Sequence, residues 1–340
     1  MKLLSDTQIK KHLLSITKDQ LEQTYLPRFE QALQDYEANP NVVPERTVLT
    51  SNYPGCDTTH LFMPCAAPHS VGTKVISGGS YNSQNGLGFQ GFTAVLDPRS
   101  GQLLGAVNAK TLTAFRTALA SFSAIWKLLK DSDTAIEQVT VIGTGPQAFW
   151  HVFLVLRAFK VKKVVVLSRS EESAQKLCKE IGEVDSVETE AFANSSCVAG
   201  EKIRKSAIVF GCSPSTEPTI KKEFVNIDPA FFQVFALIGS YKPHMVELDP
   251  QFVKDNFFGE YKVIVDSKEH TLAEAGELVQ SERTEKNLVS LTDLLGDKAQ
   301  GRVKLPSGVS VVKIVGLSIM DIYMAQLMLE SVEAPQVDFD

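Results

Sequence analysis

Hydrophobic positions change their spacing along the first third of the chain. Between residues 3 and 37 they recur at roughly helical intervals, which predicts N-terminal helices. Between residues 46 and 108 the apolar runs are short and are separated by turn residues, with a clear hairpin turn at residues 97–101. This second region is therefore expected to form an antiparallel meander of about five strands.

The remaining two thirds alternate between helical and extended patterns. Residues 112–130 predict one long helix, with Thr111 or Thr113 as the candidate cap. From there to about residue 267 strand and helix signals alternate, and several apolar runs are of the kind that a parallel sheet buries on both faces. Residues 309–331 predict one more strand, a glycine and a helix apolar on most sides. Such a helix should be buried against the N-terminal domain or a second subunit.

Residues 136–170 are the most informative stretch, because a short strand, a glycine-rich turn, a helix and a second strand follow one another there. The turn consists of Gly143, Thr144, Gly145, Pro146, Gln147 and Ala148. Gly143 permits the tight turn, Gly145 lets the backbone approach a pyrophosphate, and Ala148 lets helix and strand pack closely. The helix N-terminus then offers N–H groups to the phosphates. This predicts a dinucleotide site; the alternative is a turn that serves packing only.

The residues after the second strand bear on the choice of cofactor. An NAD-binding fold usually has an acidic residue there for the ribose 2′-OH, but this chain has Ser168, Arg169 and Ser170. An arginine between two hydroxyls would bind a 2′-phosphate, so NADP(H) is favoured over NAD(H). Two alternatives stay open: Glu171 and Glu172 can still reach a ribose, and Arg169 can lie in solvent.

Composition is that of an ordinary globular protein: 340 residues, 44% hydrophobic and 22% charged. The net charge of −6 argues against nucleic acid or an anionic membrane as a partner, and no apolar run approaches a membrane span. Five scattered cysteines fit reduced thiols and a cytoplasmic location. No metal site is expected, although one group has suitable ligand types without the usual spacing: Cys56, His60, Cys65 and His69.

The order of these elements predicts an α/β protein of two domains. A Rossmann-type doubly wound sheet over residues 119–307 is expected to bind the dinucleotide. It is inserted in a second, α+β substrate-binding and dimerisation domain, made of residues 1–118 and 308–340.

Several phrases together resemble the ornithine cyclodeaminase/mu-crystallin family, in the right order over most of the chain. The matching segments are 112–118, 143–148, 238–243, 247–249, 265–267, 274–277 and 312–317. The resemblance implies two domains, a homodimer, and nicotinamide chemistry on amino or imino acids next to their carboxylate. The family includes ornithine cyclodeaminases, alanine dehydrogenases, ketimine reductases and the NADPH-binding mu-crystallins.

Three cations match positions that bind the substrate carboxylate in the family: Arg46, Lys74 and Arg116. An imino or keto acid has to be held with its reacting carbon facing the nicotinamide, and the planar fork of arginine fixes a carboxylate in orientation as well as position. Lys74 is also a candidate catalytic residue, because a lysine with a lowered pKa can relay a proton to the substrate nitrogen. The alternative for Lys74 is an outward-facing, solvated side chain.

Further cofactor contacts are expected where parallel strands end, since ligands gather at that edge of a sheet. The candidates from strand ends and from the helix start are Thr117, Cys212, Ser213, Gly239 and Ser240. The resemblance adds Val315 and Gly316. No histidine is linked by motif to Cys212, which favours a cofactor-facing or packed thiol over a nucleophile.

The chain departs from the family pattern in two places. Tyr241 stands where ornithine cyclodeaminases have their catalytic aspartate, and a tyrosine is no general base near neutral pH. Tyr241 is therefore expected either to donate a hydrogen bond or proton to a substrate nitrogen or to stack on the nicotinamide. Gly88 and Phe89 stand where the family often has a threonine or serine, which suggests an aromatic pocket wall.

The resulting hypothesis is an NAD(P)H-dependent reductase of a small imino or keto acid, with hydride passing from nicotinamide C4 to the C=N carbon. The first alternative is a mu-crystallin-like protein that binds NADPH and a small acid with little turnover. The second is an ornithine cyclodeaminase, which releases proline and ammonia and would need another base. Because the protonated iminium is the better electrophile, activity of the reductase should be highest at mildly acidic pH.

Overall fold

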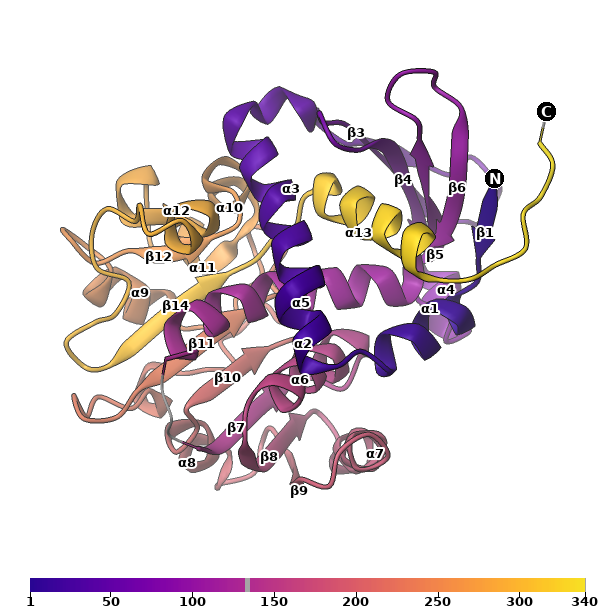
Figure 1. The fold of residues 1–340 in the computed structure, drawn as a ribbon. Helices are drawn as coiled ribbons and strands as arrows, with labels where there is room; N and C mark the ends of the chain where they lie inside the picture. Colours follow the sequence, from indigo (N-terminus) through magenta and orange to yellow (C-terminus); the bar gives the residue numbers. More distant parts are fainter. Residues whose placement is uncertain (132–134, 340) are drawn as a thin grey trace. The chain divides into compact units, whose positions relative to one another are not determined.

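A computed structural model describes residues 1–131 and 135–339 of the chain. The chain forms two compact units, which Figure 1 shows coloured along the sequence. Unit 1 contains Met1–Arg116 and Leu317–Asp340, and unit 2 contains Thr117–Gly316. The α/β fold class is confirmed: a parallel, doubly wound sheet lies in unit 2, and a mostly antiparallel sheet with helices lies in unit 1. No helix among the described residues is long and apolar enough to cross a membrane.

Unit 1 is built on a six-stranded sheet of order β1-β6-β5-β4-β3-β2. Its strands are β1 (Lys2–Leu4), β2 (Thr47–Thr50), β3 (Thr59–Ala66), β4 (Val71–Gly78), β5 (Gln90–Leu96) and β6 (Leu103–Asn108). The predicted five-strand antiparallel meander is confirmed by β2 to β6. The predicted hairpin turn follows β5, where the Asp97 carboxylate accepts from the N–H groups of Arg99 and Ser100.

The N-terminal strand β1 was not predicted, because it is too short to show a pattern of its own. It pairs in parallel with β6 at the edge of the sheet, with Lys2 opposite Gly105. On its other side Lys2 forms a bridge with Gln336. Its extended structure therefore depends on neighbours that lie far away in the sequence.

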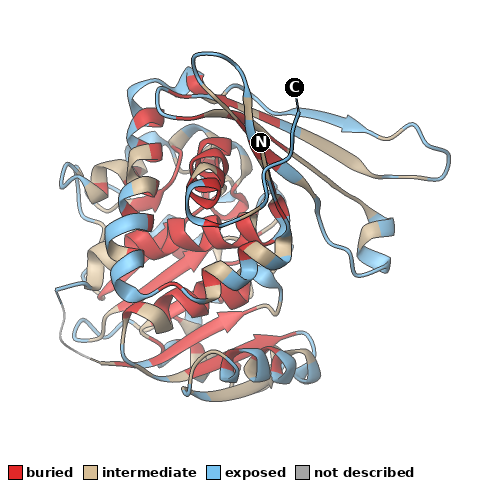
Figure 2. Ribbon diagram, turned by 45° about the vertical axis from the view of Figure 1, so that its right-hand side comes forward, coloured by how far each residue is buried: buried red, intermediate tan, exposed pale blue. Residues whose placement is uncertain are grey.

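Unit 1 also contains helices and short helical turns. They are α1 (Asp6–Leu14), α2 (Lys18–Gln20), the π-helical η1 (Leu21–Tyr25), α3 (Leu26–Ala38), the 3₁₀ turn η2 (Pro40–Val42), α4 (Ser80–Gln84) and α13 (Ser318–Ser331). The C-terminal helix α13 packs against α3 and against strands β3 to β6. It is buried on nearly all sides, as the red helix in the upper half of Figure 2 shows. Of the two partners considered for this helix, the N-terminal part of its own chain is the observed one.

The long helix α5 (Ala109–Leu129) confirms the helix predicted from residue 112, but it starts earlier and is capped differently. The expected caps, Thr111 and Thr113, were wrong because both lie inside the helix. The backbone N–H of Lys110 donates to Asn108 Oδ1, and that of Thr111 donates to Asp6 Oδ1. The second acceptor comes from α1 and could not be found from local sequence.

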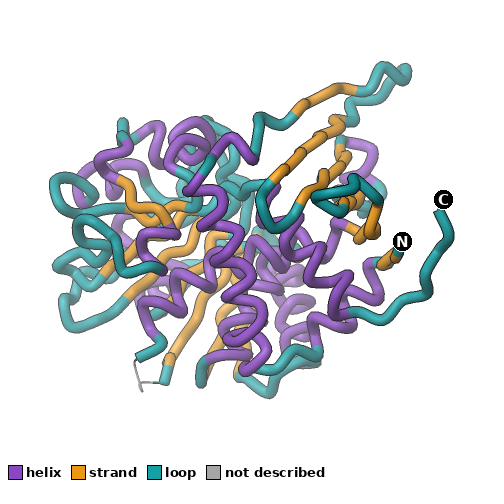
Figure 3. The backbone as a smooth tube through the Cα atoms, turned by 45° about the horizontal axis from the view of Figure 1, so that its top comes forward, coloured by secondary structure: helices purple, strands orange, loops and turns teal. Residues whose placement is uncertain are grey.

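Unit 2 contains an eight-stranded, wholly parallel sheet of order β13-β12-β14-β11-β10-β7-β8-β9. The strands are β7 (Ile136–Ile142), β8 (Val161–Ser168), β9 (Glu188–Ala193), β10 (Ile208–Gly211), β11 (Gln233–Leu237), β12 (Val263–Val265), β13 (Leu288–Ser290) and β14 (Val309–Lys313). The central strands are buried on both faces, which explains their continuous apolar runs. Figure 3 draws them as orange tubes between purple helices.

Helices and turns connect these strands: α6 (Pro146–Ala158), α7 (Glu171–Gly182), α8 (Ala199–Arg204), η3 (Lys222–Phe224), α9 (Pro250–Asn256), α10 (Lys268–Glu274), α11 (Gly276–Gln280), η4 (Glu285–Asn287) and α12 (Leu291–Leu295). The strand order runs outward from β7 in both directions, to β8 on one side and to β10 on the other. A topological switch point therefore lies between β7 and β10, the place where open α/β sheets bind ligands.

Strand β14 lies in the interior of this parallel sheet, between β11 and β12. Residues 308–340 were expected to lie together in the first domain, and for this strand the expectation was wrong. The apolar sequence of β14 is typical of a strand in a sheet that is buried on both faces. Only the helix that follows this strand belongs to unit 1.

Candidate functional site

The glycine turn between β7 and α6 has the geometry that a dinucleotide requires. Gly143 has φ +122°, and a Cβ there would lie 2.7 Å from the carbonyl oxygen of Cys212, so only glycine fits. Gly145 is the N-cap of α6, whose first residue is Pro146 and which has no side-chain cap. A Cβ on Gly145 would meet nothing within 4 Å. The turn therefore presents open space beside unsatisfied helix N–H groups, which fits a pyrophosphate.

Three more residues of this turn differ in exposure. Ala148 is fully buried, as close packing of helix and strand requires. Thr144 is partly exposed at the turn. Gln147 has a buried Oε1 atom without a hydrogen-bond partner among the described residues. Such an atom is costly unless a ligand or water pairs with it, which is a second observation in favour of a bound group.

The segment after β8 places the three candidates for cofactor selection side by side. Ser168 is buried at the strand end, while Arg169 and Ser170 are exposed. Ser170 is the N-cap of α7, where its hydroxyl oxygen accepts from the N–H of Ser173 at 3.1 Å. Arg169 thus stands next to a second helix N-terminus, and both features favour an anion.

The backbone N–H groups at the next strand ends are used by two buried carboxylates. Glu247 accepts from the N–H groups of Ser213, Gly239 and Ser240. Asp266 accepts from those of Val315 and Gly316. These five residues were predicted to contact the cofactor, and the structure assigns their N–H groups to the protein itself.

The other two predicted cofactor residues differ in exposure: Thr117 is buried, whereas Cys212 is half-buried after β10. Thr117 is 5% exposed within α5. Burial raises the pKa of the Cys212 thiol well above its usual range, with a further increase from the nearby Glu247 carboxylate. A thiol in that state is a poor nucleophile, in line with the packed or cofactor-facing cysteine expected from sequence.

Two of the three predicted carboxylate-binding cations meet inside unit 1. Lys74 on β4 and Arg116 on α5 both contact Oδ1 of Asp321 on α13, through Nζ at 2.7 Å and through Nε at 3.0 Å. Lys74 is 1% and Arg116 5% exposed, and Asp321 is completely buried. The outward-facing alternative for Lys74 is thereby excluded. Because Arg116 uses Nε in this contact, its terminal nitrogens lie outside it.

The surroundings of Lys74 make its proton labile. Burial, opposed by the charge of Asp321, lowers its pKa to about 8, and the positive charges of Arg116 and Arg46 act in the same direction as burial. Arg46 itself is exposed just before β2. The three cations therefore lie within electrostatic reach of one another, and Lys74 and Arg116 share a single carboxylate oxygen of Asp321.

Polar atoms beside this cluster lack protein partners. Asp321 Oδ2 and Thr93 Oγ1 are buried and have no hydrogen-bond partner among the described residues. Thr93 lies directly opposite Lys74 in the β4–β5 pair, on the same face of the sheet. Two buried cations that share one carboxylate oxygen, with an unpaired hydroxyl group beside them, form an environment that suits a small carboxylate ligand.

The two positions that depart from the family pattern are exposed. Tyr241 follows β11 and is 45% exposed, so its ring is available to a ligand. Phe89 is 56% exposed in the turn before β5, close to Gly78, where a Cβ would lie 2.8 Å from its ring. Gly88 beside it has φ +63°, a conformation that favours glycine.

The two histidines considered as metal ligands have other partners. Nδ1 of His60 bonds with the Ser77 hydroxyl, and Nδ1 of His69 bonds with Asp35 Oδ2. No group of three potential ligands is close enough to hold a metal among the described residues. His151 lies buried between Ser121 Oγ and its own helix backbone, and burial lowers its pKa to about 4.

Sequence reasoning missed the acidic partners of these sites, Asp321, Glu247 and Asp266. A signal existed for Asp321, since a lone acid inside an otherwise apolar helix is rarely buried unless it is paired. Lys313, at the end of an apolar strand, gave a similar signal. Which residues pair with them follows only from the fold.

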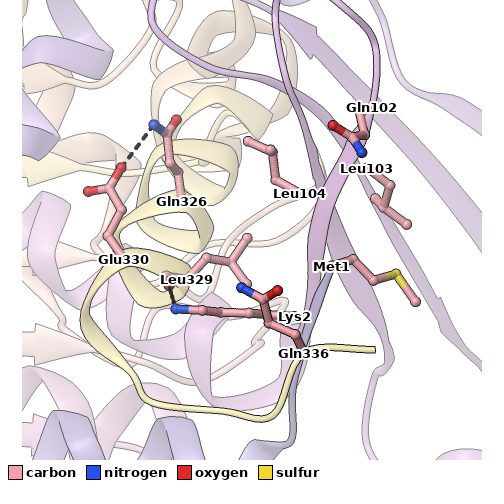
Figure 4. A pocket seen from close by; sticks show the side chains of 9 residues that line it. All are labelled: Met1, Lys2, Gln102, Leu103, Leu104, Gln326, Leu329, Glu330 and Gln336. Carbon is pink, nitrogen blue, oxygen red and sulfur yellow. Dashed lines mark hydrogen bonds between the residues drawn. The ribbon is translucent and has the colours of Figure 1, made fainter. Parts of the chain in front are cut away.

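One open pocket of about 320 Å³ lies near the chain ends in unit 1 (Figure 4). Lys2 and Glu330 are among its lining residues, and both have protein partners: Lys2 donates to the Leu329 carbonyl, and Glu330 pairs with Arg28. None of the predicted site residues lines it.

Comparisons with known proteins agree with this arrangement. The chain is 28% identical to a Δ1-pyrroline-2-carboxylate reductase of Bacillus cereus, over 88% of this chain and 89% of that protein. It is 26% identical to the ketimine reductase mu-crystallin of Rattus norvegicus, over 96% of each chain. Among solved structures, the Thermococcus litoralis Δ1-pyrroline-2-carboxylate reductase in complex with NADH and L-proline shares the fold, with a TM-score of 0.78, 24% identity and 97% coverage of each chain.

The match to a family model extends over nearly the whole length described above. Residues 8–336 fit the model of a single family, and they include the glycine turn, the buried cations and the apolar C-terminal helix. The resemblance inferred from short phrases is therefore confirmed. This chain belongs to the ornithine cyclodeaminase/mu-crystallin family.

Proposed function

We propose that this protein is an NAD(P)H-dependent reductase of a small imino acid whose carboxylate is next to the C=N bond. The observation that supports this best is the buried cluster in which Lys74 and Arg116 share one oxygen of Asp321. Two relatives of similar length that are named as imino acid reductases support the same reaction class.

In this proposal the cations of unit 1 hold the substrate carboxylate. Arg116 offers a planar guanidinium and Lys74 a buried ammonium, and Arg46 adds a third positive charge from the surface. The unpaired Thr93 Oγ1 donates a further hydrogen bond to the same ligand. Holding the carboxylate fixes the position of the adjacent imine carbon, which lowers the entropic part of the barrier.

A nicotinamide cofactor, when bound, would supply the hydride for the imine carbon. The substrate nitrogen must then hold one more proton than it does in a neutral imine, and Lys74 is the candidate donor. Its pKa of about 8 lets it lose a proton near neutral pH far more readily than an ordinary lysine. Tyr241 is a candidate for a hydrogen bond to the substrate nitrogen or for stacking on the nicotinamide.

We infer a preference for NADPH over NADH from the segment after β8. Arg169 is exposed beside Ser170 at the N-terminus of α7, where a 2′-phosphate would meet a positive charge and hydroxyl groups. Replacing Arg169 with glutamate should weaken NADPH binding by about tenfold or more and leave NADH binding nearly unchanged, since a charge-assisted hydrogen bond contributes about 1.5–3 kcal/mol.

The decisive experiment is to follow NADPH and NADH oxidation by the purified protein between pH 5 and 8. Δ1-Piperideine-2-carboxylate, Δ1-pyrroline-2-carboxylate, and pyruvate with ammonia are offered separately. We expect oxidation with at least one of them, and its loss in Lys74→Ala and Arg116→Ala. The matched controls Lys11→Ala and Arg99→Ala remove exposed cations of the same unit and should keep activity.

Two outcomes would overturn this proposal. Tight NADPH binding without oxidation of any of these imino acids would favour the mu-crystallin-like binding protein. Release of proline and ammonia from ornithine would favour the cyclodeaminase, despite the tyrosine at position 241.

We propose further that the protein is a homodimer through the open face of the unit 1 sheet. Phe62, Val75 and Phe92 are directly opposite one another on β3, β4 and β5, on the face turned away from Lys74 and α13. Phe62 is 39% and Phe92 44% exposed, and β2 beside them is exposed along its length (Figure 2, pale blue). A second copy of the same apolar face would cover these rings.

A further inference from the structure

A cluster of buried charges lies beneath the carboxyl ends of β10, β11 and β14. We call it the strand-end cluster, and it consists of Ser240, Glu247, Glu277 and Lys313. Each of the four is at most 1% exposed. Lys313 Nζ donates to Ser240 Oγ at 2.5 Å, and Ser240 Oγ donates to Glu277 Oε2 at 2.5 Å. Lys313 also lies 3.3 Å from Glu277 Oε1, so the cluster contains two carboxyl groups and one amino group.

Glu247 uses both carboxylate oxygens to hold backbone N–H groups. Oε1 accepts from Ser213 at 3.1 Å, and Oε2 accepts from Gly239 at 2.6 Å and from Ser240 at 3.3 Å. Ser213 follows β10, whereas Gly239 and Ser240 follow β11. One side chain therefore ties together the loops at the ends of two neighbouring strands.

Two glycines make room for this carboxylate. A Cβ on Gly211, the last residue of β10, would lie 2.8 Å from Glu247 Oε1. A Cβ on Gly239 would lie 2.5 Å from the same oxygen. Both distances are shorter than a Cβ atom allows. A side chain at either glycine position would therefore displace the Glu247 carboxylate. Gly239 was predicted from sequence to contact the cofactor. In the structure, glycine is required there because the Glu247 carboxylate lies where a Cβ would be.

The tied loops adjoin the dinucleotide turn. Cys212 immediately precedes Ser213, and its carbonyl oxygen is the atom that a Cβ on Gly143 would approach to 2.7 Å. A shift of the loop after β10 would therefore act directly on the turn between β7 and α6. That turn borders the topological switch point, where ligands of such sheets bind.

We propose that Glu247 is a positioning residue for the nicotinamide cofactor, because its carboxylate sets the spacing of the loops after β10 and β11. The inference rests on the proposed function only in taking that cofactor as the ligand. Glutamine has nearly the same shape, but its NH₂ group would face a backbone N–H at one of the two oxygens. The structure therefore requires a carboxylate at this position, and not merely a side chain of that size.

The protonation of Glu247 offers a readout that a purely structural role would not give. Burial raises its pKa to about 7; Glu277 on α11 adds to this rise, and Lys313 on β14 opposes it. The thiol of Cys212 is the other titratable group close to it. Only the ionised form accepts hydrogen bonds at both oxygens, so cofactor affinity should fall as the pH drops through about 7.

The test measures NADH dissociation constants by fluorescence titration of wild type and Glu247→Gln between pH 6 and 8.5. NADH is chosen because it lacks the 2′-phosphate, which titrates in the same range. We expect wild type to bind more weakly at the acidic end. Glu247→Gln should bind about tenfold more weakly at pH 8 and show no such step, since the amide group would place a donor against a backbone N–H. The matched control is Glu217→Gln, which alters an exposed carboxylate in the loop after β10.

A second variant covers the case in which Glu247→Gln does not fold. Gly211→Ala keeps the glutamate in the sequence, but its methyl group pushes the carboxylate away from the loops, so NADH binding should be weakened in the same way. A folded Glu247→Gln or Gly211→Ala protein that binds NADH with wild-type affinity and pH dependence overturns the proposal. Wild type that binds NADH but reduces no imino acid overturns only the proposed function, whereas wild type that binds neither NADH nor NADPH overturns both.

Discussion

Lys74 is a buried lysine of β4 whose amino group pairs with Asp321 of α13. A lysine that interrupts a strand is costly unless it is paired, and this predicted an anion nearby. The structure adds that the protein itself supplies part of that anion through Asp321, which comes from the opposite end of the chain. Asp321 thereby stabilises the lysine in its buried position, where the pKa of the lysine is lowered to about 8.

Substrate affinity should therefore depend on the protonation of Lys74. Its pKa is lowered to about 8, so the cationic form is complete near pH 6.5 and is lost as the pH rises through 8, instead of near the usual 10.4. We expect the inhibition constant of pyrrole-2-carboxylate to rise by about tenfold per pH unit above 8. In Lys74→Arg the cation persists to high pH, so the same titration should be nearly flat. A step at pH 8 that survives this substitution would assign it to another group.

Asp321 is a positioning residue in this proposal, since it holds Lys74 and Arg116 without a role in the reaction itself. Asp321→Asn keeps an acceptor at Oδ1 but leaves both buried cations without a counter-charge, which should cost about 3–5 kcal/mol of unfolding free energy in urea. Because the Asp321 charge raises the pKa of Lys74, the pH step in inhibitor binding should also move to lower pH.

Ligand-induced stabilisation distinguishes a positioning role of Asp321 from a purely structural one. A carboxylate ligand replaces part of the lost charge, so pyrrole-2-carboxylate should raise the melting temperature of Asp321→Asn more than that of wild type, in proportion to its occupancy. The exposed Asp19→Asn serves as control. An unmoved pH step in Asp321→Asn would leave only the structural role.

The helices and strands that were predicted correctly are those whose pattern lies within their own residues. The strand–glycine turn–helix–strand unit was predictable because each of its segments has its own signature and all four are adjacent. The missed elements depend on distant partners: β1 is extended because β6 pairs with it, and the start of α5 is capped from α1. Residues of the candidate site follow the same division. The cations were predicted from motifs. The roles of Asp321 and Glu247 follow only from the contacts that they make in the folded chain.

Substitutions at the two glycines of the dinucleotide turn should distinguish an effect on protein stability from an effect on cofactor binding. Gly145 has φ −84° and open space around its missing Cβ, so Gly145→Ala should leave the urea midpoint nearly unchanged. The added methyl group lies where the backbone meets the pyrophosphate, and NADH affinity should fall by about tenfold or more. Gly143→Ala combines φ +122° with a 2.7 Å contact, and it should lower stability itself. Equal NADH affinity in Gly145→Ala and wild type would remove the pyrophosphate from this turn.

For the whole molecule, the open sheet face of unit 1 is the feature that a single chain leaves unexplained. The C-terminal helix was one candidate for contact with a second subunit, but it is buried within unit 1. The exposed rings of Phe62 and Phe92 stand on the other face of the sheet, with Val75 between them on the intervening strand. Apolar strands of this kind rarely remain open to water.

Light scattering at micromolar concentration should therefore give twice the chain mass for wild type. The double variant Phe62→Glu, Phe92→Glu brings like charges into a two-fold interface and should give the mass of one chain. Its helical content should be unchanged, because both rings are already partly exposed in the monomer. Ile227→Glu, at a position 75% exposed in unit 2, should leave the dimer intact. A wild-type protein of single-chain mass, or a double variant that remains a dimer, would remove this face as the interface.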